Sequence, residues 1–427
     1  MRPHASADGA RGVFLAYDKS MLAAAFLVLG VLMFTYARLI GAIDSDISLS
    51  ASYGRAFSDG YARLCGYLRL EDIFTPDAIY VAAQRASVGF REKRDTERFM
   101  RAPWENSLRL CDSVINGSFV PRYYRPYAIC ERGKVRTIVP PTFECKVVQK
   151  VLCELLLRPL LTHRMIATSY ASICGRGTDA MYEDVLSAIN HVMLSPRMCW
   201  HDYSVVMCDY RSYFVSIDVG LLERLVLRRY IRDDAAVDMI MRFFPDRVGL
   251  PIGSEISQMP ATFFPSPVDH RMKDDWGLPY FRYMDDTLAI VPNQLVCGYV
   301  REYQRLSGRL GLSCPDEKVG VVHLGKCFSF CKERFRFVRH GVARYVREIN
   351  PRRVSAERRK LRRFEDAVRS GEMTIDGAMA HASGVIGGIA RHPRARGDVR
   401  MLRERAQVVR DAAGVASGCP SGASSRT

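Results

Sequence analysis

The chain has 427 residues, of which 48% are apolar and 25% charged; this composition excludes a disordered or fibrous protein and leaves room for two or three folded domains. Lysines and arginines number 62 against 46 acidic residues, and the net charge of +16 favours a polyanionic partner such as nucleic acid, although basic membrane-surface proteins share it. The 13 cysteines include no Cys-x-x-Cys pair, which disfavours a disulfide framework.

Residues 1–37 combine a polar start with an uncharged, apolar run from Ser20 to Ala37. The run approaches the ~20 residues that a membrane-spanning helix needs. Three readings stay open: a membrane anchor, translated sequence upstream of the true start, and a buried helix. Asp8 and Asp18 before the run disfavour a signal peptide. We therefore expect a cytoplasmic protein, with a tether to the inner membrane through residues 20–37 as one alternative.

Apolar periodicity divides the following residues into helices and strands. Residues 38–120 are expected to be mainly helical. Tyr123–Val139 predicts two strands joined by a turn, and 321–322 and 328–330 predict further strands. Other helices are predicted over 77–88, 143–161, 179–193, 219–230, 300–310, 352–363 and 391–410.

Several residues have a structural reading that needs no chemistry. Asp218 is expected to cap a helix, and Gly384–Gly388 to interrupt one. His323, Cys327 and Cys331 repeat at the spacing of a zinc site, but their surroundings are strand-like, so packed thiols are the preferred interpretation.

Three carboxylates stand at the ends of strand-like runs. Asp285 and Asp286 separate the apolar runs 279–284 and 287–291, which predicts a β-hairpin with both carboxylates at its tip. Asp209 ends a third apolar run and would lie beside Asp285 if the strands pair. Neighbouring carboxylates repel one another, and a hard cation such as Mg²⁺ relieves that repulsion. A solvated acidic turn is the alternative.

The segment Tyr283–Asp286, with Asp209 upstream, resembles the palm of bacterial reverse transcriptases. The resemblance covers residues 70–400, and its specificity comes from the order of the blocks. It is nearest to the enzymes of diversity-generating retroelements, group II intron-like elements and antiviral defence systems. The further blocks, in the order of the family, are Lys134–Pro140, Ser169–Tyr170 with Gly175–Thr178, and Gly249–Gln258.

The resemblance implies an α+β fold in the form of a right hand, with fingers, an antiparallel-sheet palm and a helical thumb. It divides the chain after residue 37 into an N-terminal extension with fingers over 38–200, a palm over 201–345 and a basic thumb over 346–412. The Ser-, Gly- and Pro-rich composition at the C-terminal end predicts a disordered tail over 413–427.

The resemblance also assigns roles to residues. Asp209, Asp285 and Asp286 would be catalytic and bind two Mg²⁺ ions, with Mn²⁺ as a substitute, and Lys318 would donate a proton to the departing pyrophosphate. Phe214 would exclude a ribose 2′-hydroxyl. The other nucleotide-binding residues would be Lys134, Arg136, Ile252 and Gly253, and the nucleic-acid-binding residues Tyr283, Met284, Arg176, Arg358, Arg359 and Arg362.

Some of these assignments have simpler alternatives. Lys134 and Arg136 could belong to a solvated basic hairpin, and Gly175–Thr178 could form a helix-capping loop. Most relatives have glutamine where Ile252 stands and proline where Gln258 stands, and the loss of the glutamine amide predicts lower copying fidelity.

The predicted function is RNA-directed DNA synthesis, the addition of dNTPs to a 3′-end, in a retroelement or an antiviral defence system. The expected partners are an RNA template, a DNA or RNA primer, and a dedicated noncoding RNA or accessory protein. Two alternatives stay open: a DNA polymerase that uses a DNA template or none, and a catalytically inactive, basic RNA-binding scaffold.

Overall fold

The computed structural model describes residues 64–89, 94–131, 134–339, 341–390, 392 and 395–416. Contacts within the chain define two compact units, unit 1 (1–165 and 214–265) and unit 2 (166–213 and 266–427). Helices and antiparallel sheets occur in both, which confirms the predicted α+β class. The two units are defined by contacts alone. They do not test the predicted division of the chain into five segments, from the N-terminal segment to the C-terminal tail, and that division stays a prediction.

The predicted membrane segment, residues 20–37, lies outside the described residues. In the part of the chain that the structure does describe, no helix combines the length and the apolar character that crossing a bilayer requires.

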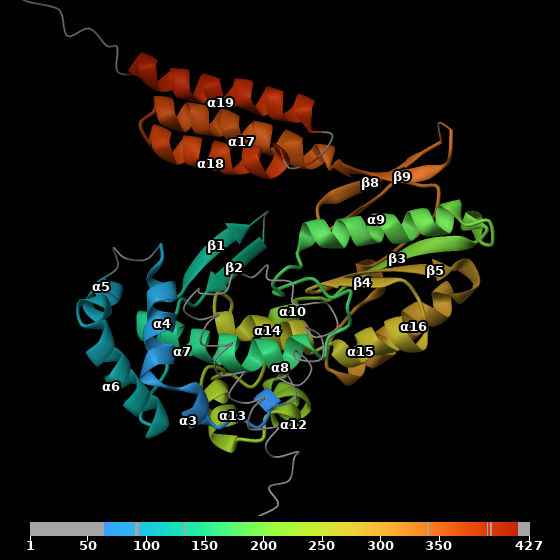
Figure 1. The fold of residues 1–427 in the computed structure, drawn as a ribbon. Helices are drawn as coiled ribbons and strands as arrows, with labels where there is room; N and C mark the ends of the chain where they lie inside the picture. Colours follow the sequence, from blue (N-terminus) through green and yellow to red (C-terminus); the bar gives the residue numbers. More distant parts are fainter. Residues whose placement is uncertain are drawn as a thin grey trace, which may run out of the picture. The chain divides into compact units, whose positions relative to one another are not determined.

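Unit 1 is mainly helical and carries one two-stranded sheet (Figure 1). Its strands, β1 (Tyr127–Glu131) and β2 (Lys134–Ile138), form the predicted antiparallel hairpin. Its helices are α3 (Leu70–Ile73), α4 (Pro76–Ser87), α5 (Arg94–Arg101), α6 (Pro103–Ile115), α7 (Phe143–Val151), α8 (Arg158–Thr162), α11 (Val219–Leu222), α12 (Arg228–Tyr230), α13 (Asp234–Met241) and α14 (Glu255–Phe263).

Two of the predicted helices of unit 1 contain a π-helical segment. Residues Leu152–Leu157 join α7 to α8, and Glu223–Leu227 join α11 to α12. The predictions over 143–161 and 219–230 are therefore confirmed as helical stretches. Asp218 accepts a hydrogen bond from the backbone N–H of Leu221 at 2.7 Å, which confirms its role as the N-cap of α11.

Unit 2 is built on a four-stranded antiparallel sheet in the order β4-β5-β3-β6. Its strands are β3 (Tyr203–Asp209), β4 (Tyr280–Tyr283), β5 (Asp286–Pro292) and β6 (Val319–His323). Helix α9 (Thr178–Leu194) packs Val185 and Ile189 into one core with Val205 and Ile290 of the sheet. Central strands are buried on both faces, as expected for the continuous apolar runs of the sequence.

Further elements complete unit 2. Helices α15 (Ser266–His270) and α16 (Val296–Arg309) lie across the sheet from α9 (Figure 1). A second antiparallel sheet contains β7 (Phe328–Phe330), β8 (Glu333–Val338) and β9 (Arg344–Ile349), and its aromatic residues share a core with α9. The short helix α10 (Tyr213–Ser216) crosses the division between the units along the chain.

Three helices end unit 2: α17 (Pro351–Arg369), α18 (Ile375–Ala390) and α19 (Arg396–Ala416). The predicted interruption at Gly384–Gly388 is wrong, because α18 continues through these glycines. Each glycine costs about 1 kcal/mol relative to alanine in a helix. Burial of Ala378, Ala382 and Ile389 against the neighbouring helices outweighs that cost.

Candidate active site

The predicted carboxylates meet at one end of the sheet of unit 2. Asp209 is the last residue of β3 and lies opposite Asp286, the first residue of β5, in the antiparallel register. Directly opposed residues hold their Cβ atoms roughly 4.5–5.5 Å apart. Asp285 lies in the turn that joins Tyr283 of β4 to Asp286. The hairpin is confirmed, and the register places Asp209 opposite Asp286 rather than Asp285.

The site contains three carboxylates and one neighbouring lysine, Lys318. Burial, reinforced by the charges of Asp285 and Asp209, raises the pKa of Asp286 to about 6. Lys318, which ends a short 3-10 turn before β6, donates a hydrogen bond to Asp209 Oδ2, and this bond raises the pKa of Lys318. The thiol of Cys331 lies 3.5 Å from Asp286 Oδ2. All three carboxylates thus lie at the same end of the sheet, and Lys318 offsets part of the negative charge there.

The donor chemistry of the site suits Mg²⁺. Carboxylate oxygens are the hard ligands that this ion prefers. Burial first, and then the charges of Asp285 and Asp209, raise the pKa of Asp286, and a bound cation would favour its ionised form. The three carboxylates are not gathered as a ready-made centre: the described residues contain no group of three or more His, Cys, Asp or Glu side chains that could hold an ion.

The zinc-like spacing of three residues near β7 does not form a zinc site in the described residues. Ser204 Oγ lies 3.0 Å from His323 Nδ1, and Cys331 contacts Asp286. Cys327 is exposed, so the interpretation as packed thiols is wrong for this residue.

In unit 1, the loop that precedes α14 is hydrogen-bonded to the residue that follows β2. The backbone N–H of Val139 donates to the carbonyl of Ile252 at 3.2 Å. Gly253 has φ +96°, and a Cβ on it would lie 2.9 Å from Ile138 Cγ2. A side chain at Gly253 would therefore face both backbone strain and a steric clash. The loop places Ile252 and Gly253 against the strand that begins with Lys134.

Phe214 belongs to the same part of unit 1. Its carbonyl accepts a hydrogen bond from the N–H of Leu250 at 2.8 Å, and its side chain is half-buried. Arg136 is exposed on β2, but so are its neighbours Val135 and Thr137, so the predicted alternation of buried and exposed residues along this strand is not seen. The structure thus gathers the predicted nucleotide-binding residues of unit 1 around one hairpin and one loop.

The predicted nucleic-acid contacts occur in three settings of unit 2. Tyr283 and Met284 are half-buried at the carboxylate turn. Arg176 donates to the carbonyl of Ser169 at 3.0 Å, a contact within the loop before α9 that distinguishes neither of the two predicted roles of Gly175–Thr178. Three arginines lie exposed on α17: Arg358, Arg359 and Arg362.

Helix α17 is amphipathic. Asn350 caps its N-terminus by accepting from the N–H of Arg352 at 3.0 Å. Buried Val354, Leu361 and Val368 lie on one face and share a core with α18 and α19. Because the apolar residues take this face, the arginines of the opposite face are exposed.

Sequence reasoning missed a buried ion pair next to the carboxylates. Arg282 Nε donates to Asp269 Oδ2 at 2.7 Å, and both side chains are almost fully buried, with exposed fractions of 0% and 1%. Tyr280 donates its hydroxyl proton to Asp269 Oδ1 at 2.7 Å. The available signal was the arginine between Phe281 and Tyr283, since a charge inside an apolar strand needs a buried partner.

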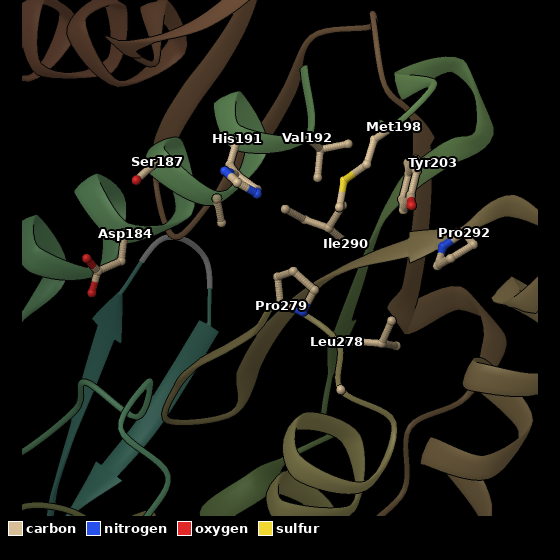
Figure 2. A pocket seen from close by; sticks show the side chains of 12 residues that line it. Asp184, Ser187, His191, Val192, Met198, Tyr203, Leu278, Pro279, Ile290 and Pro292 are labelled. Atoms are coloured by element: carbon tan, nitrogen blue, oxygen red, sulfur yellow. The ribbon is translucent and has the colours of Figure 1, made fainter. Parts of the chain in front are cut away.

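A cavity of about 470 Å³ lies between α9 and the sheet (Figure 2). Asp184, Ser187 and His191 line it on the helix side, and Pro279 and Pro292 on the strand side. These prolines mark the end of the β4–β5 hairpin opposite the turn with Asp285. None of the predicted site residues lines this cavity, so it is separate from the carboxylate site.

No family model matches the chain, and no curated protein matches it. A solved structure of telomerase from Candida albicans, in complex with a TWJ fragment of telomeric RNA, aligns with 11% identity and a TM-score of 0.39. The alignment covers 50% of this chain and 44% of that chain, less than half of the telomerase chain. A likeness at this level carries no weight for fold or function, which rest on the residues described above.

Proposed function

We propose that the chain is an RNA-directed DNA polymerase, a reverse transcriptase that adds dNTPs to the 3′-end of a primer on an RNA template. The observation that carries this proposal is the register that pairs Asp209 with Asp286 and places Asp285 in the adjoining turn. Two carboxylates at paired strand ends, with a third in the adjoining turn, suit phosphoryl transfer, a reaction catalysed mainly by positioning the reactants and stabilising charge.

In this proposal the elements take the roles of a right hand. The sheet of β3 to β6 is the palm, the hairpin of β1 and β2 with the surrounding helices forms the fingers, and α17 to α19 form the thumb. The amphipathic α17 supports the thumb assignment, because its arginines are exposed where a nucleic-acid backbone could bind.

Asp209, Asp285 and Asp286 would together hold two Mg²⁺ ions. Bound there, the ions would activate the 3′-hydroxyl and neutralise the leaving pyrophosphate. Lys318, beside Asp209, would stabilise the pyrophosphate and donate a proton to it.

The residues of unit 1 would select and hold the incoming nucleotide. Lys134 and Arg136 would bind its triphosphate, Arg136 through paired hydrogen bonds and Lys134 as a point charge. Phe214 would pack against the sugar and exclude a 2′-hydroxyl. The close packing of Gly253 against Ile138 would keep the loop of Ile252 in place beside the incoming nucleotide and its template base.

The function is tested by primer extension with the full-length protein, Mg²⁺ and dNTPs. Three conditions are compared: an RNA template, a DNA template of the same sequence, and no template. We expect extension on RNA at least about tenfold faster than on DNA, a difference of about 1.4 kcal/mol in the barrier. Extension on DNA alone or without template would support the alternative polymerase. RNA binding without extension of any primer, including RNA recovered with the protein, would support the scaffold.

Ile252→Gln is expected to lower misincorporation. The carbonyl of Ile252 is held by Val139, so the side chain can change without moving the loop. One restored hydrogen bond of about 1 kcal/mol corresponds to a roughly fivefold gain in fidelity. Sequencing of the DNA product measures the error rate, with Ile252→Leu as the control. Equal error rates for Ile252→Gln and the natural protein would contradict the role of this position.

Replacement of Arg358, Arg359 and Arg362 by glutamine is expected to weaken binding of an RNA–DNA duplex. Each lost phosphate contact lowers the slope of log affinity against log salt by about 0.7 to 0.9, so the slope should fall by about 2 to 3. Fluorescence anisotropy at several salt concentrations measures it. Three exposed arginines of unit 1, Arg94, Arg101 and Arg109, supply a charge-matched control. Equal losses from both triple variants would rule out a specific role of α17.

A further inference from the structure

The buried pair of Arg282 and Asp269 is connected to the carboxylate turn by a direct contact. Arg282 Nη1 donates to the carbonyl of Met284 at 3.0 Å. Met284 and Asp285 form the turn between β4 and β5, so this carbonyl is one peptide unit away from Asp285. The same guanidinium therefore binds a buried carboxylate with one nitrogen and the backbone of the catalytic turn with another.

The turn itself needs such support. Met284 has φ +55°, a left-handed conformation that costs roughly 1–2 kcal/mol for residues other than glycine. A two-residue hairpin turn with positive φ at its first residue usually has glycine there. Because methionine carries the strain instead, the surrounding contacts must hold the turn in place.

Arg282 is held through its backbone as well as its side chain. Its N–H donates to the carbonyl of Thr168 at 3.0 Å, and its carbonyl accepts from the N–H of Tyr170 at 3.1 Å. Asp269 uses both carboxylate oxygens on β4, one for Arg282 and one for Tyr280. The guanidinium therefore has little conformational freedom. Its hydrogen bond to the carbonyl of Met284 restricts the position of that carbonyl in turn.

The energetics of buried ion pairs suggest a role beyond stability. Replacing such a pair by well-packed apolar residues is often neutral or stabilising, whereas removing one partner alone is costly. An apolar pair could fill the space of Arg282 and Asp269. It could not donate a hydrogen bond to the carbonyl of Met284.

We propose that Arg282, held by Asp269 and Tyr280, is a positioning residue that fixes the turn carrying Asp285 and thereby enables the carboxylates to bind metal. The inference rests on the proposed function, because the turn is taken to be the metal-binding part of a polymerase. The rival explanation is that the pair merely fills the core of unit 2.

The decisive variant combines Arg282→Met with Asp269→Leu in the full chain, which removes both charges and keeps most of the volume. We expect its melting temperature to stay within about 4 °C of the natural protein. The midpoint of Mn²⁺ binding, followed by electron paramagnetic resonance, should rise about tenfold or more, as for other residues that orient metal ligands. In the metal-free protein, the backbone amides of the β4–β5 segment should exchange their hydrogens faster than in the natural protein.

Two further variants complete the experiment. Arg282→Lys keeps the positive charge beside Asp269, but a single ammonium group lacks the fork of nitrogens that lets arginine donate to Asp269 and to the carbonyl of Met284 together. This variant should therefore fold but bind Mn²⁺ more weakly. It decides the matter if the double variant does not fold. Arg405→Met with Glu365→Leu removes another ion pair of unit 2, between α17 and α19, and should leave the Mn²⁺ midpoint unchanged.

The possible results separate this inference from the proposed function. If Asp285→Asn loses Mn²⁺ binding while the folded double variant keeps the natural midpoint and exchange rate, the positioning role is overturned and the metal site stands. If Asp285→Asn binds Mn²⁺ like the natural protein, the metal site and the positioning role both fail. A weakened midpoint with faster exchange in the double variant, and an unchanged control, supports the inference.

Discussion

Replacement of Asp285 by asparagine should reduce DNA synthesis by about a thousandfold or more. The substitution keeps the size of the side chain and removes one charge from the three-carboxylate site. A loss of about 4 kcal/mol of transition-state stabilisation corresponds to this factor, and bound metal ions contribute several kcal/mol. Single-turnover primer extension on an RNA template, with Mg²⁺ and dNTPs, measures the rate.

Stability distinguishes this effect from unfolding. The charge of Asp285 helps to raise the pKa of Asp286, so its removal relieves repulsion, and the melting temperature should be equal or higher. Asp202, an exposed residue just before β3, provides the control: Asp202→Asn should retain normal synthesis. Synthesis that survives Asp285→Asn at the natural rate would refute the assignment of the carboxylates.

Replacement of Phe214 by alanine should weaken the choice of dNTPs over rNTPs by about 10- to 100-fold, a change of about 1–3 kcal/mol. Removal of the ring opens space for a 2′-hydroxyl. The hydrogen bond between Leu250 and Phe214 uses backbone atoms, so the path of the chain should persist. The ratio of kcat/KM for each dNTP and its matching rNTP measures the effect.

The neighbouring residue supplies the control for this experiment. Val215 lies in the same short helix and its side chain is exposed, so Val215→Ala should leave the ratio unchanged. An unchanged ratio in Phe214→Ala would remove Phe214 from sugar selection. An equal change in both variants would instead point to a general distortion of α10.

Local sequence patterns predicted the elements that carry the carboxylates. Asp285 and Asp286 interrupt an apolar run, and such an interruption indicates a turn between strands because the side chains on either side need burial. Asp209 ends another such run, and the structure places it at the end of β3. The role of Asp218 as an N-cap was predictable for the same reason, since capping depends on residues close in sequence.

Other features depend on partners that are distant in sequence. The register that sets Asp286 opposite Asp209 is fixed by packing between strands separated by many residues. Asp269 and Arg282 each look unremarkable until the fold buries them together. The glycines of α18 predicted a break because local propensity disfavours helix there, but contacts with α17 and α19 override it.

Under the proposed function, the left-handed backbone of Met284 would limit how far the protein can be stabilised without losing activity. Glycine at this position would relax the turn in the native state, so a screen for heat resistance alone could favour it. The relaxed turn would also visit more conformations, and Asp285 would be held less tightly. Strain of this kind is a source of trade-off between thermal endurance and activity, and selection for both should retain a side chain at this position.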